Sequence, residues 1–311
     1  MKQVFLFAGQ GSQKAGMGKD FYDTFESYRK VIDSAQLSFD LRQMMHEAPL
    51  EELSKTEYTQ PCMAAFAAGV LAVLKENGIV PEAACGLSLG EYGALYAAGV
   101  LECGEYLKLV EFRGKVMAEA AKECSCSMSA ILGLDAGTVE NVCDSCKNVG
   151  YITLANYNCP GQYVICGDEE AVLEAEKKLK EQGARRCVRL NVSGPFHTSY
   201  MKPAGDALKQ YFETLDFQKP QIPVVLNVTG DFYQETEDLK TLCVQQVQNS
   251  VRLEASLRKL LEAGAEQFVE IGPGNTLAGF LKKTAKDMGK KVQVTSIDSV
   301  TSLEKYLQQA M

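Results

Sequence analysis

Two patterns of apolar residues alternate along the chain. Short apolar runs at residues 4–7 and 83–86 indicate buried strands, whereas the apolar residues within 21–32 and 59–75 recur at the spacing of one helix face. A further helix is expected over 91–98, soon after the second strand. Strands that alternate with helices in this way predict an α/β protein with a parallel sheet.

The middle of the chain has a different order of elements. Its patterns predict strands at 127–133, 151–155, 163–167 and 186–192 and helices at 136–147 and 169–182. The resulting order, βαββαβ, is that of the ferredoxin-like fold. We therefore expect a ferredoxin-like small subdomain, residues 126–192, inserted in a large α/β subdomain made of residues 1–125 and 193–311, with a cleft between the two.

Composition and charge exclude several classes of protein. The 311 residues carry 32 Lys and Arg against 40 Asp and Glu, a net charge of −8, and such an acidic chain lacks the clustered positive charge on which nucleic-acid binding depends. No apolar stretch approaches the roughly 20 residues that span a bilayer, and the first residues run into a glycine turn without a signal region. We expect a cytoplasmic monomer that binds neither nucleic acid nor membrane.

Eleven cysteines and two histidines limit the metal sites that the chain could form. Cys143 and Cys146 form a C-x-x-C pair, with Cys124 and Cys126 upstream, so a four-thiolate zinc site is one interpretation. Zinc-binding pairs usually occupy tight turns, whereas this segment has a helical pattern, which favours reduced cysteines that pack in the core. Two histidines are too few for a multi-histidine site, and we expect no metal.

Residues 86–90, Gly-Leu-Ser-Leu-Gly, follow the second predicted strand and precede a helix. A serine on such a sharp strand-to-helix turn needs small neighbours, and its hydroxyl is exposed above the helix N-terminus. This nucleophile elbow is typical of an α/β-hydrolase-like core, so we expect that fold for the large subdomain and take Ser88 as the candidate nucleophile. A helix start with a capping serine is the alternative.

A serine nucleophile needs a base, and histidine is the usual one. His46 lies at the end of an amphipathic helical pattern with no other candidate catalytic residue near it in the sequence. His197 follows Pro195 and Phe196 at the junction where the chain returns to the large subdomain. The position of His197 and the lack of a rival favour it as the base.

The first loop, residues 8–13, contains Gly9 and Gly11. A dinucleotide-binding fingerprint requires a third glycine where Lys14 stands, so we exclude that site. The loop is better explained as a backbone turn whose N–H groups face a developing oxyanion.

Six sequence blocks together resemble the malonyl-CoA:acyl carrier protein transacylases, the acyltransferase family of fatty acid and polyketide synthesis. The blocks are residues 7–13 (FAGQGSQ), 86–92 (GLSLGEY), 110–114 (VEFRG), 155–162 (ANYNCPGQ), 195–197 (PFH) and 270–274 (EIGPG). They follow the order of the family and cover nearly the whole chain.

The resemblance implies a role for five of the residues. Ser88 attacks the malonyl thioester, and His197 acts as general base and then as general acid. The backbone N–H groups of Gln10 and Leu89 form the oxyanion hole, and the main-chain carbonyl of Gln246, rather than a carboxylate, orients the histidine. The implied catalytic unit is a Ser-His dyad.

Further residues are implied to bind the acyl group. The guanidinium of Arg113 can hold the free carboxylate of malonate with two parallel hydrogen bonds. The ring of Phe196 leaves little room for a 2-methyl branch, and Asn158 is a further substrate-binding residue. Leu87 departs from the family, which usually has His at this position. The resemblance therefore does not fix the range of acyl groups that this chain accepts.

The implied reaction is a ping-pong transfer. Malonyl-CoA acylates Ser88, CoA leaves, and the phosphopantetheine thiol of an acyl carrier protein accepts the malonyl group, with no bound cofactor. An acidic carrier protein needs local positive charge on this acidic enzyme. Candidate basic residues are Lys177, Lys178, Lys180, Arg185, Arg186, Arg189, Lys282 and Lys283; a solvated charged face is the alternative.

Other functions would use the same residues. A malonyl transferase that serves a polyketide synthase in trans has the same fold and chemistry, and an acyl hydrolase would use Ser88 and His197 with water as the acceptor. Arg113 argues against the hydrolase, because an unbranched acyl chain has no carboxylate for it to bind. A non-catalytic binding module would need neither Ser88 nor His197.

Overall fold

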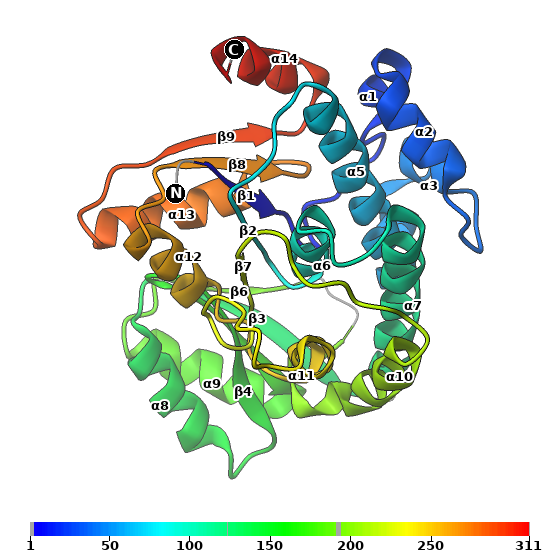
Figure 1. The fold of residues 1–311 in the computed structure, drawn as a ribbon. Helices are drawn as coiled ribbons and strands as arrows, with labels where there is room; N and C mark the ends of the chain where they lie inside the picture. The colour runs from blue at the N-terminus through cyan, green and yellow to red at the C-terminus, as the bar shows by residue number, and fades with distance from the viewer. Residues whose placement is uncertain (1–2, 123, 191–193, 311) are drawn as a thin grey trace.

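The computed structural model describes residues 3–122, 124–190 and 194–310, and its strands form two sheets (Figure 1). The larger sheet has the order β7-β2-β1-β8-β9, with β1 (Gln3–Phe7), β2 (Ala83–Gly86), β7 (Val224–Val225), β8 (Gln267–Ile271) and β9 (Gln293–Ile297). All its pairs are parallel, so each connection must cross over through other elements. The parallel sheet that the alternating pattern predicts is confirmed.

Helices cover both faces of this sheet. The helices outside the second sheet are α1 (Lys19–Thr24), α2 (Glu26–Ser34), α3 (Leu41–His46), α4 (Leu50–Leu53), α5 (Thr56–Glu76), α6 (Leu89–Ala97), α7 (Cys103–Ala121), η1 (Ser199–Met201), α10 (Lys202–Phe212), α11 (Leu239–Gln248), α12 (Leu253–Glu262), α13 (Thr276–Asp287) and α14 (Val300–Ala310). In β1, Phe5 and Phe7 belong to the core that contains α5 and α6, whereas Val4 and Leu6 belong to the core that contains α12 and α13. Successive strand residues point to opposite faces, so a strand covered on both sides is apolar at every position.

Two differences from the predicted helices matter most, beside shifts of one to three residues at other helix ends. The apolar pattern over 21–32 forms two helices rather than one, because Phe25 is extended (φ −111°, ψ 123°) between α1 and α2. Phe21, Tyr28 and Ile32 are nevertheless buried in the same core, which explains the continuous pattern. The helix predicted to begin at residue 91 begins at Leu89, directly after the candidate nucleophile.

The second sheet is antiparallel and has the order β4-β5-β3-β6. Its elements are β3 (Cys126–Leu132), α8 (Ala136–Cys146), β4 (Ile152–Cys159), β5 (Gln162–Asp168), α9 (Glu169–Glu181) and β6 (Arg186–Arg189), and we call them the small subdomain. Their βαββαβ order is the ferredoxin-like one that the sequence predicts. The predicted strand end at Val192 and the boundary at 192/193 lie outside the described residues, and the boundary at 125/126 stays a prediction.

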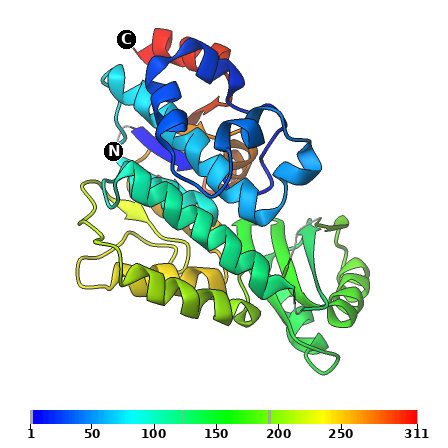
Figure 2. The same ribbon diagram turned by 90° about the vertical axis from the view of Figure 1, so that its right-hand side faces the viewer.

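The small subdomain turns one face of its sheet toward the larger sheet. Ile131 and Ile165 pack under α8 and α9 on the outer face, whereas Met128, Ala130 and Val164 join the main core on the inner face. Figure 2 shows α7 crossing the view with the small subdomain at its end. This arrangement brings the inner face of the small sheet over the end of β2.

The main chain of β4 also pairs with the segment that follows α11. The N–H of Tyr157 donates to the carbonyl of Val251 (2.8 Å), and the N–H of Val251 donates to the carbonyl of Ala155 (2.9 Å).

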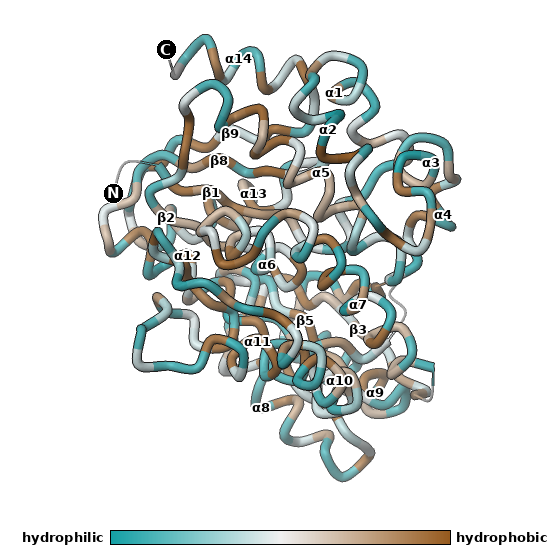
Figure 3. Tube along the Cα trace, turned by 45° about the vertical axis from the view of Figure 1, so that its right-hand side comes forward, coloured by the Kyte–Doolittle hydropathy of each residue, from teal (hydrophilic) through white to brown (hydrophobic). Residues whose placement is uncertain are grey.

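Figure 3 shows hydrophobic colouring in the central strands β1 and β8 and hydrophilic colouring on outer turns. Among the helices of the described residues, none is long and apolar enough to cross a membrane.

Candidate active site

Ser88 lies on the turn between β2 and α6 with a strained backbone, φ 53° and ψ −104°. Positive φ is unfavourable for residues other than glycine, so the surrounding contacts must hold this conformation. A Cβ on Gly86 would lie 2.0 Å from the carbonyl carbon of Gly90, and a Cβ on Gly90 would lie 2.0 Å from the carbonyl oxygen of Phe7. Both glycines of the motif are therefore required sterically.

His197 connects Ser88 to α11. Its Nε2 lies 2.7 Å from Oγ of Ser88, and its Nδ1 lies 2.9 Å from the main-chain oxygen of Gln246. A carbonyl oxygen can only accept a hydrogen bond, so Nδ1 carries the proton. Nε2 is then the free lone pair that can take the proton of the serine hydroxyl.

The site keeps His197 neutral. Burial and the nearby positive charge of Arg113 lower the pKa of His197 to about 4, because both disfavour the imidazolium ion. The backbone groups of Gln246 and Asn249 act in the opposite direction. At neutral pH the histidine is therefore in the form that a general base requires.

Arg113 is completely buried on α7, with its guanidinium beside the serine. Nη2 donates to Oγ of Ser88 (3.1 Å) and to Oε1 of Gln246 (3.0 Å), and Nη1 donates to Oε1 of Gln60 (2.7 Å). Its ring contact is with Tyr92, whose centroid lies 5.2 Å away. A buried cation next to the nucleophile provides a binding site for an anionic group.

The two residues expected to form the oxyanion hole lie on different elements. Leu89 is the first residue of α6, so its N–H has no carbonyl partner within the helix. Gln10 lies in the loop after β1, where its side chain donates to Oγ1 of Thr56 (3.1 Å) and accepts from Gln60. The N–H of Leu87 donates to the carbonyl of Phe7 (3.1 Å), which fixes the two loops side by side.

A cavity of about 170 Å³ contains both Ser88 and His197 in its wall. Its other lining residues come from the main core and from the inner face of the small sheet, and they include Phe196 and Asn158. Oδ1 of Asn158 is buried and has no hydrogen-bond partner among the described residues. Asn158 therefore carries a buried acceptor without a partner beside a mainly apolar cavity.

Leu87 also lines this cavity. It packs against the core that contains α12 and α13, and a Cβ on Gly9 would lie 2.6 Å from the carbonyl oxygen of Leu87. At this position the side chain supplies an apolar wall rather than a hydrogen bond.

The C-x-x-C cysteines and the other histidine lie away from these residues. Cys143 and Cys146 are buried in the core of the small subdomain, under α8, and all eleven cysteines are free. No group of three potential metal ligands occurs within the described part of the chain. His46 ends α3 and stacks edge-on against Tyr22.

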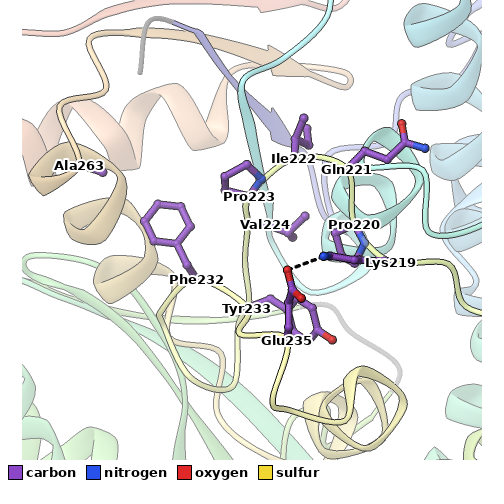
Figure 4. Close-up of a pocket in the computed structure, with 10 residues that line it drawn as sticks. All are labelled: Lys219, Pro220, Gln221, Ile222, Pro223, Val224, Phe232, Tyr233, Glu235 and Ala263. Carbon is purple, nitrogen blue, oxygen red and sulfur yellow. Dashed lines mark ion pairs between the residues drawn. The ribbon is translucent and has the colours of Figure 1, made fainter.

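A larger surface hollow, about 510 Å³, lies elsewhere (Figure 4). Lys219 and Glu235 form an ion pair at its edge (2.6 Å), and Phe232 and Tyr233 line it. None of the candidate catalytic residues takes part in this hollow, so volume alone is a poor guide to the site.

Sequence reasoning missed the contacts that Asn227, Glu91 and the side chain of Gln246 make around the serine. Oδ1 of Asn227 accepts the N–H of Ser88 (2.6 Å), Glu91 accepts the N–H of Asn227, and the side chain of Gln246 donates to the carbonyl of Ser88 (2.8 Å). Glu91 belongs to a quoted block, but no spacing pattern marked Asn227 or the side chain of Gln246.

This geometry suits transfer of an acyl group. A serine that a neutral imidazole deprotonates forms an ester with an activated acyl group, which a second nucleophile can then accept. A strained serine with a neutral imidazole beside it, in one cavity, is the arrangement of enzymes that move an acyl group through a serine.

Comparison with known proteins defines the family. The acyl transferase domain matches residues 4–309. The malonyl CoA-acyl carrier protein transacylase of Bacillus subtilis is 40% identical over 302 residues, which is 96% of this chain and 95% of the relative. The protein of the same name from Clostridium perfringens has a crystal structure with a TM-score of 0.95 and 37% identity, over 100% of this chain and 97% of that one.

A third comparison concerns a complex. A type II PKS acyl-carrier protein bound to its malonyl-transacylase has been solved, and the matched chain has a TM-score of 0.94 and 36% identity, over 99% of this chain and 100% of that one. With these matches over nearly the full length, the chain belongs to the acyl transferase domain family.

Proposed function

We propose that this protein transfers the malonyl group of malonyl-CoA to the phosphopantetheine thiol of an acyl carrier protein, through an ester on Ser88, and so supplies fatty acid biosynthesis. The names of the relatives from Bacillus subtilis and Clostridium perfringens support the substrate. The observation that carries the proposal is the position of Nη2 of Arg113, 3.1 Å from Oγ of Ser88. This buried cation matches the free carboxylate that distinguishes malonyl from acetyl groups.

In the first half-reaction Ser88 becomes acylated. Nε2 of His197 takes the hydroxyl proton while Oγ attacks the thioester carbonyl, and the N–H groups of Gln10 and Leu89 stabilise the oxyanion. Each such donor is typically worth about 3–4 kcal/mol in the transition state. The C–S bond then breaks, and the sulfur of CoA leaves with the proton from His197.

The second half-reaction repeats these steps with another thiol. His197 accepts the proton of the phosphopantetheine thiol while the sulfur of this thiol attacks the malonyl ester. The ester C–O bond then breaks, and Oγ of Ser88 leaves with the proton from His197. The carbonyl of Gln246 keeps Nδ1 of His197 protonated in both directions. Both half-reactions use only groups of this chain, so we infer no bound cofactor and no metal.

The cavity restricts the acyl group. Phe196 and Asn158 lie in its wall; the ring of Phe196 disfavours a 2-methyl branch, and the free acceptor of Asn158 is available for a donor on the substrate. Leu87 makes the wall beside the serine apolar. We infer that small malonyl groups fit and that bulkier branched groups fit less well.

The basic residues that could receive the carrier protein divide into two groups. Lys177, Lys178 and Lys180 lie on α9, which covers the outer face of the small sheet, away from the cavity. Lys283 lies on α13 one turn after Phe280, which lines the cavity, and its Nζ donates to Oε1 of Gln162 (3.1 Å).

The basic residues of the edge strand β6 also lie on opposite faces of the small sheet. Arg186 is paired with Leu132 and so shares the inner face of the sheet, whereas Arg189 forms ion pairs with Glu169 and Glu176 on the α9 side. We propose that the carrier protein docks beside Lys283 and Arg186.

The same proposal includes the oligomeric state and the cellular location of the enzyme. We propose that it acts as a monomer in the cytoplasm, where its free cysteines remain reduced. Light scattering of the purified protein tests the monomer, with a dimer mass as the contrary result.

A second candidate is transfer of malonyl groups to the carrier protein of a polyketide synthase. The solved complex of a type II PKS acyl-carrier protein with its malonyl-transacylase favours it, and the chemistry would be unchanged. An acyl hydrolase is disfavoured because it leaves the charge of Arg113 without use.

A parallel assay of malonyl-CoA and acetyl-CoA, with carrier protein or water as acceptor, tests the proposal. We expect transfer of malonyl to the carrier protein and little hydrolysis. In Arg113→Ala the preference for malonyl over acetyl should fall about tenfold to a hundredfold, since charge-assisted hydrogen bonds are worth about 1.5–3 kcal/mol.

Arg258→Ala is the control, because Arg258 pairs with Glu254 and Asp287 on α12 and α13, outside the cavity. Its selectivity should match that of the wild type. Unchanged selectivity in Arg113→Ala, or dominant hydrolysis in the wild type, would contradict malonyl transfer.

A further inference from the structure

Glu91 is a buried carboxylate behind the nucleophile that the reaction scheme leaves without a role. It lies in the first turn of α6 and is 1% exposed. Burying a carboxylate is costly unless donors compensate it, and the donors here are the N–H of Asn227 and the side-chain amide of Gln246. Both donors lead directly to Ser88.

Asn227 links Glu91 to the amide side of the elbow. Its Oδ1 accepts the N–H of Ser88 (2.6 Å), and its Nδ2 donates to the carbonyl of Gly86 (2.7 Å). These bonds fix the two peptide groups on either side of Leu87, where the backbone enters the strained conformation of Ser88.

Gln246 links Glu91 to the carbonyl side of the elbow and to the other functional groups. Its Nε2 donates to the carbonyl of Ser88 (2.8 Å), its Oε1 accepts from Arg113 (3.0 Å), and its main-chain oxygen binds His197 (2.9 Å). One residue therefore contacts three groups of the site, and two of them, Ser88 and Arg113, are held by its side-chain amide.

We propose that Glu91 is a positioning residue for acyl transfer, whose ionised carboxylate holds Asn227 and Gln246 so that Ser88 is fixed at both its N–H and its carbonyl. The ionised carboxylate only accepts hydrogen bonds, so both of its oxygens are available to these donors. Protonation, or replacement by an amide, turns one of the two positions into a donor and weakens the acceptor that faces Asn227 and Gln246. This inference rests on the proposed function only in taking Ser88 as the acylated group.

The surroundings of Glu91 make this ionisation depend on pH near neutrality. Burial raises the pKa of Glu91 to about 7, while the donors from Asn227 and Gln246 and the charge of Arg113 act against the rise. The other titratable groups that interact with it are Cys85 on β2, Cys243 on α11 and Tyr92 on α6. Burial raises the pKa of each of these three, so they stay neutral.

The test is the pH profile of kcat for malonyl transfer, from about pH 5.5 to about pH 8.5, in the wild type and in Glu91→Gln. The wild type should lose activity as the pH falls through about 7, whereas Glu91→Gln should be flat. At high pH the variant should be slower by about tenfold, the factor expected when a charge-assisted hydrogen bond is lost. The two curves should meet at low pH, and the KM for malonyl-CoA should change little.

Glu111→Gln is the matched control. Glu111 is also a buried glutamate, but it binds Ser38 and Lys115 on the far side of α7, so its variant should keep the wild-type profile. A flat wild-type profile, or wild-type speed in Glu91→Gln at high pH, overturns the proposal.

Melting curves show whether Glu91→Gln folds. If it does not, the test uses the pH profile of the wild type together with that of Glu91→Asp. This variant keeps the charge, so it should still lose activity as the pH falls through about 7. A wild type that transfers no malonyl at any pH would contradict the proposed function instead, so the two failures are distinguishable.

Discussion

His197 acts through the different surroundings of its two ring nitrogens. Nδ1 is committed to the carbonyl of Gln246, which leaves Nε2 available to Ser88. A carboxylate in place of this carbonyl would favour the imidazolium ion more strongly, whereas burial and the nearby Arg113 favour the neutral base. The proposed dyad thus has a base that is unprotonated over the whole physiological range.

This lowered pKa predicts a pH dependence of stability. Unfolded histidine has a pKa of about 6.5, and the pKa of His197 in the folded protein is about 4. Between these values the unfolded chain binds more protons, so the stabilising contribution of neutral His197 is complete above about pH 6.5 and is lost as the pH falls toward 4. The shift corresponds to about 3 kcal/mol.

The measurement compares the free energy of unfolding of the wild type and of His197→Gln by urea titration at several pH values. The wild type should gain about 3 kcal/mol relative to the variant as the pH rises from about 4 to about 6.5. Glu91 is present in both proteins, so its own titration cancels. A difference that does not vary with pH would contradict a buried neutral histidine.

At this scale the sequence identifies some residues and not others. Ser88 is marked by its glycines, and His197 by the scarcity of histidine. Asn227 and Gln246 lie 139 and 158 positions from Ser88. The resemblance names Gln246 for its main-chain carbonyl, but no local pattern indicates the role of its side chain or of Asn227. Their contacts depend on how α11 and the loop after β7 pack against the elbow, which is tertiary structure.

At the scale of elements, α6 is held against β1 by close backbone contact. Gly90 and Gly93 face Phe7 without side chains of their own, and this closeness fixes the N-terminus of the helix directly after Ser88. Adding a methyl group at Gly90 would push α6 away from the strand.

Gly90→Ala should therefore lower the free energy of unfolding by about 2–3 kcal/mol, as overpacking does, and should reduce acyl transfer. Gly104→Ala is the control, because a Cβ there has no atom within 4 Å, and alanine in a helix is favoured by up to about 1 kcal/mol. Denaturant titration measures both. A Gly90→Ala protein as stable as the wild type would contradict the steric argument.

The existence of most elements follows from the apolar pattern, and the positions of their ends follow less well. The strand at 83–86 is predicted with its observed bounds. The break at Phe25 has no glycine or proline, and its extended backbone places both short helices on the core. The last two residues of the strand expected at 186–192 lie outside the described residues.

At the scale of the whole molecule, the cavity exists because the small sheet turns its inner face toward β2 and α6. The contacts of Val251 with β4 fix this orientation beside His197 and Gln246. The sequence predicts both sheets but not their relative placement, because Val251 and Ala155 are distant in sequence and pair only through their main chains.

This placement predicts where the carrier protein docks. Lys283→Glu should raise the KM for the carrier protein by about threefold to tenfold, or about 1 kcal/mol, with little change for malonyl-CoA. The wild-type KM should also rise with salt. Steady-state kinetics with each substrate varied in turn measures the effect.

Lys177→Glu supplies the control, since Lys177 is exposed on α9. It reverses the same charge on the outer side of the small subdomain and should leave both KM values unchanged. Equal effects of the two substitutions would indicate that net charge, rather than a docking site at α13, governs the encounter.

The acylated serine is the central claim, and mass spectrometry of the intact protein tests it most directly. Incubation with malonyl-CoA should add the mass of one malonyl group, and subsequent carrier protein should remove it and gain the same mass. Ser88→Ala should show no addition while it remains folded. A malonyl adduct that persists in Ser88→Ala, or transfer without any acylated wild-type enzyme, would contradict the account.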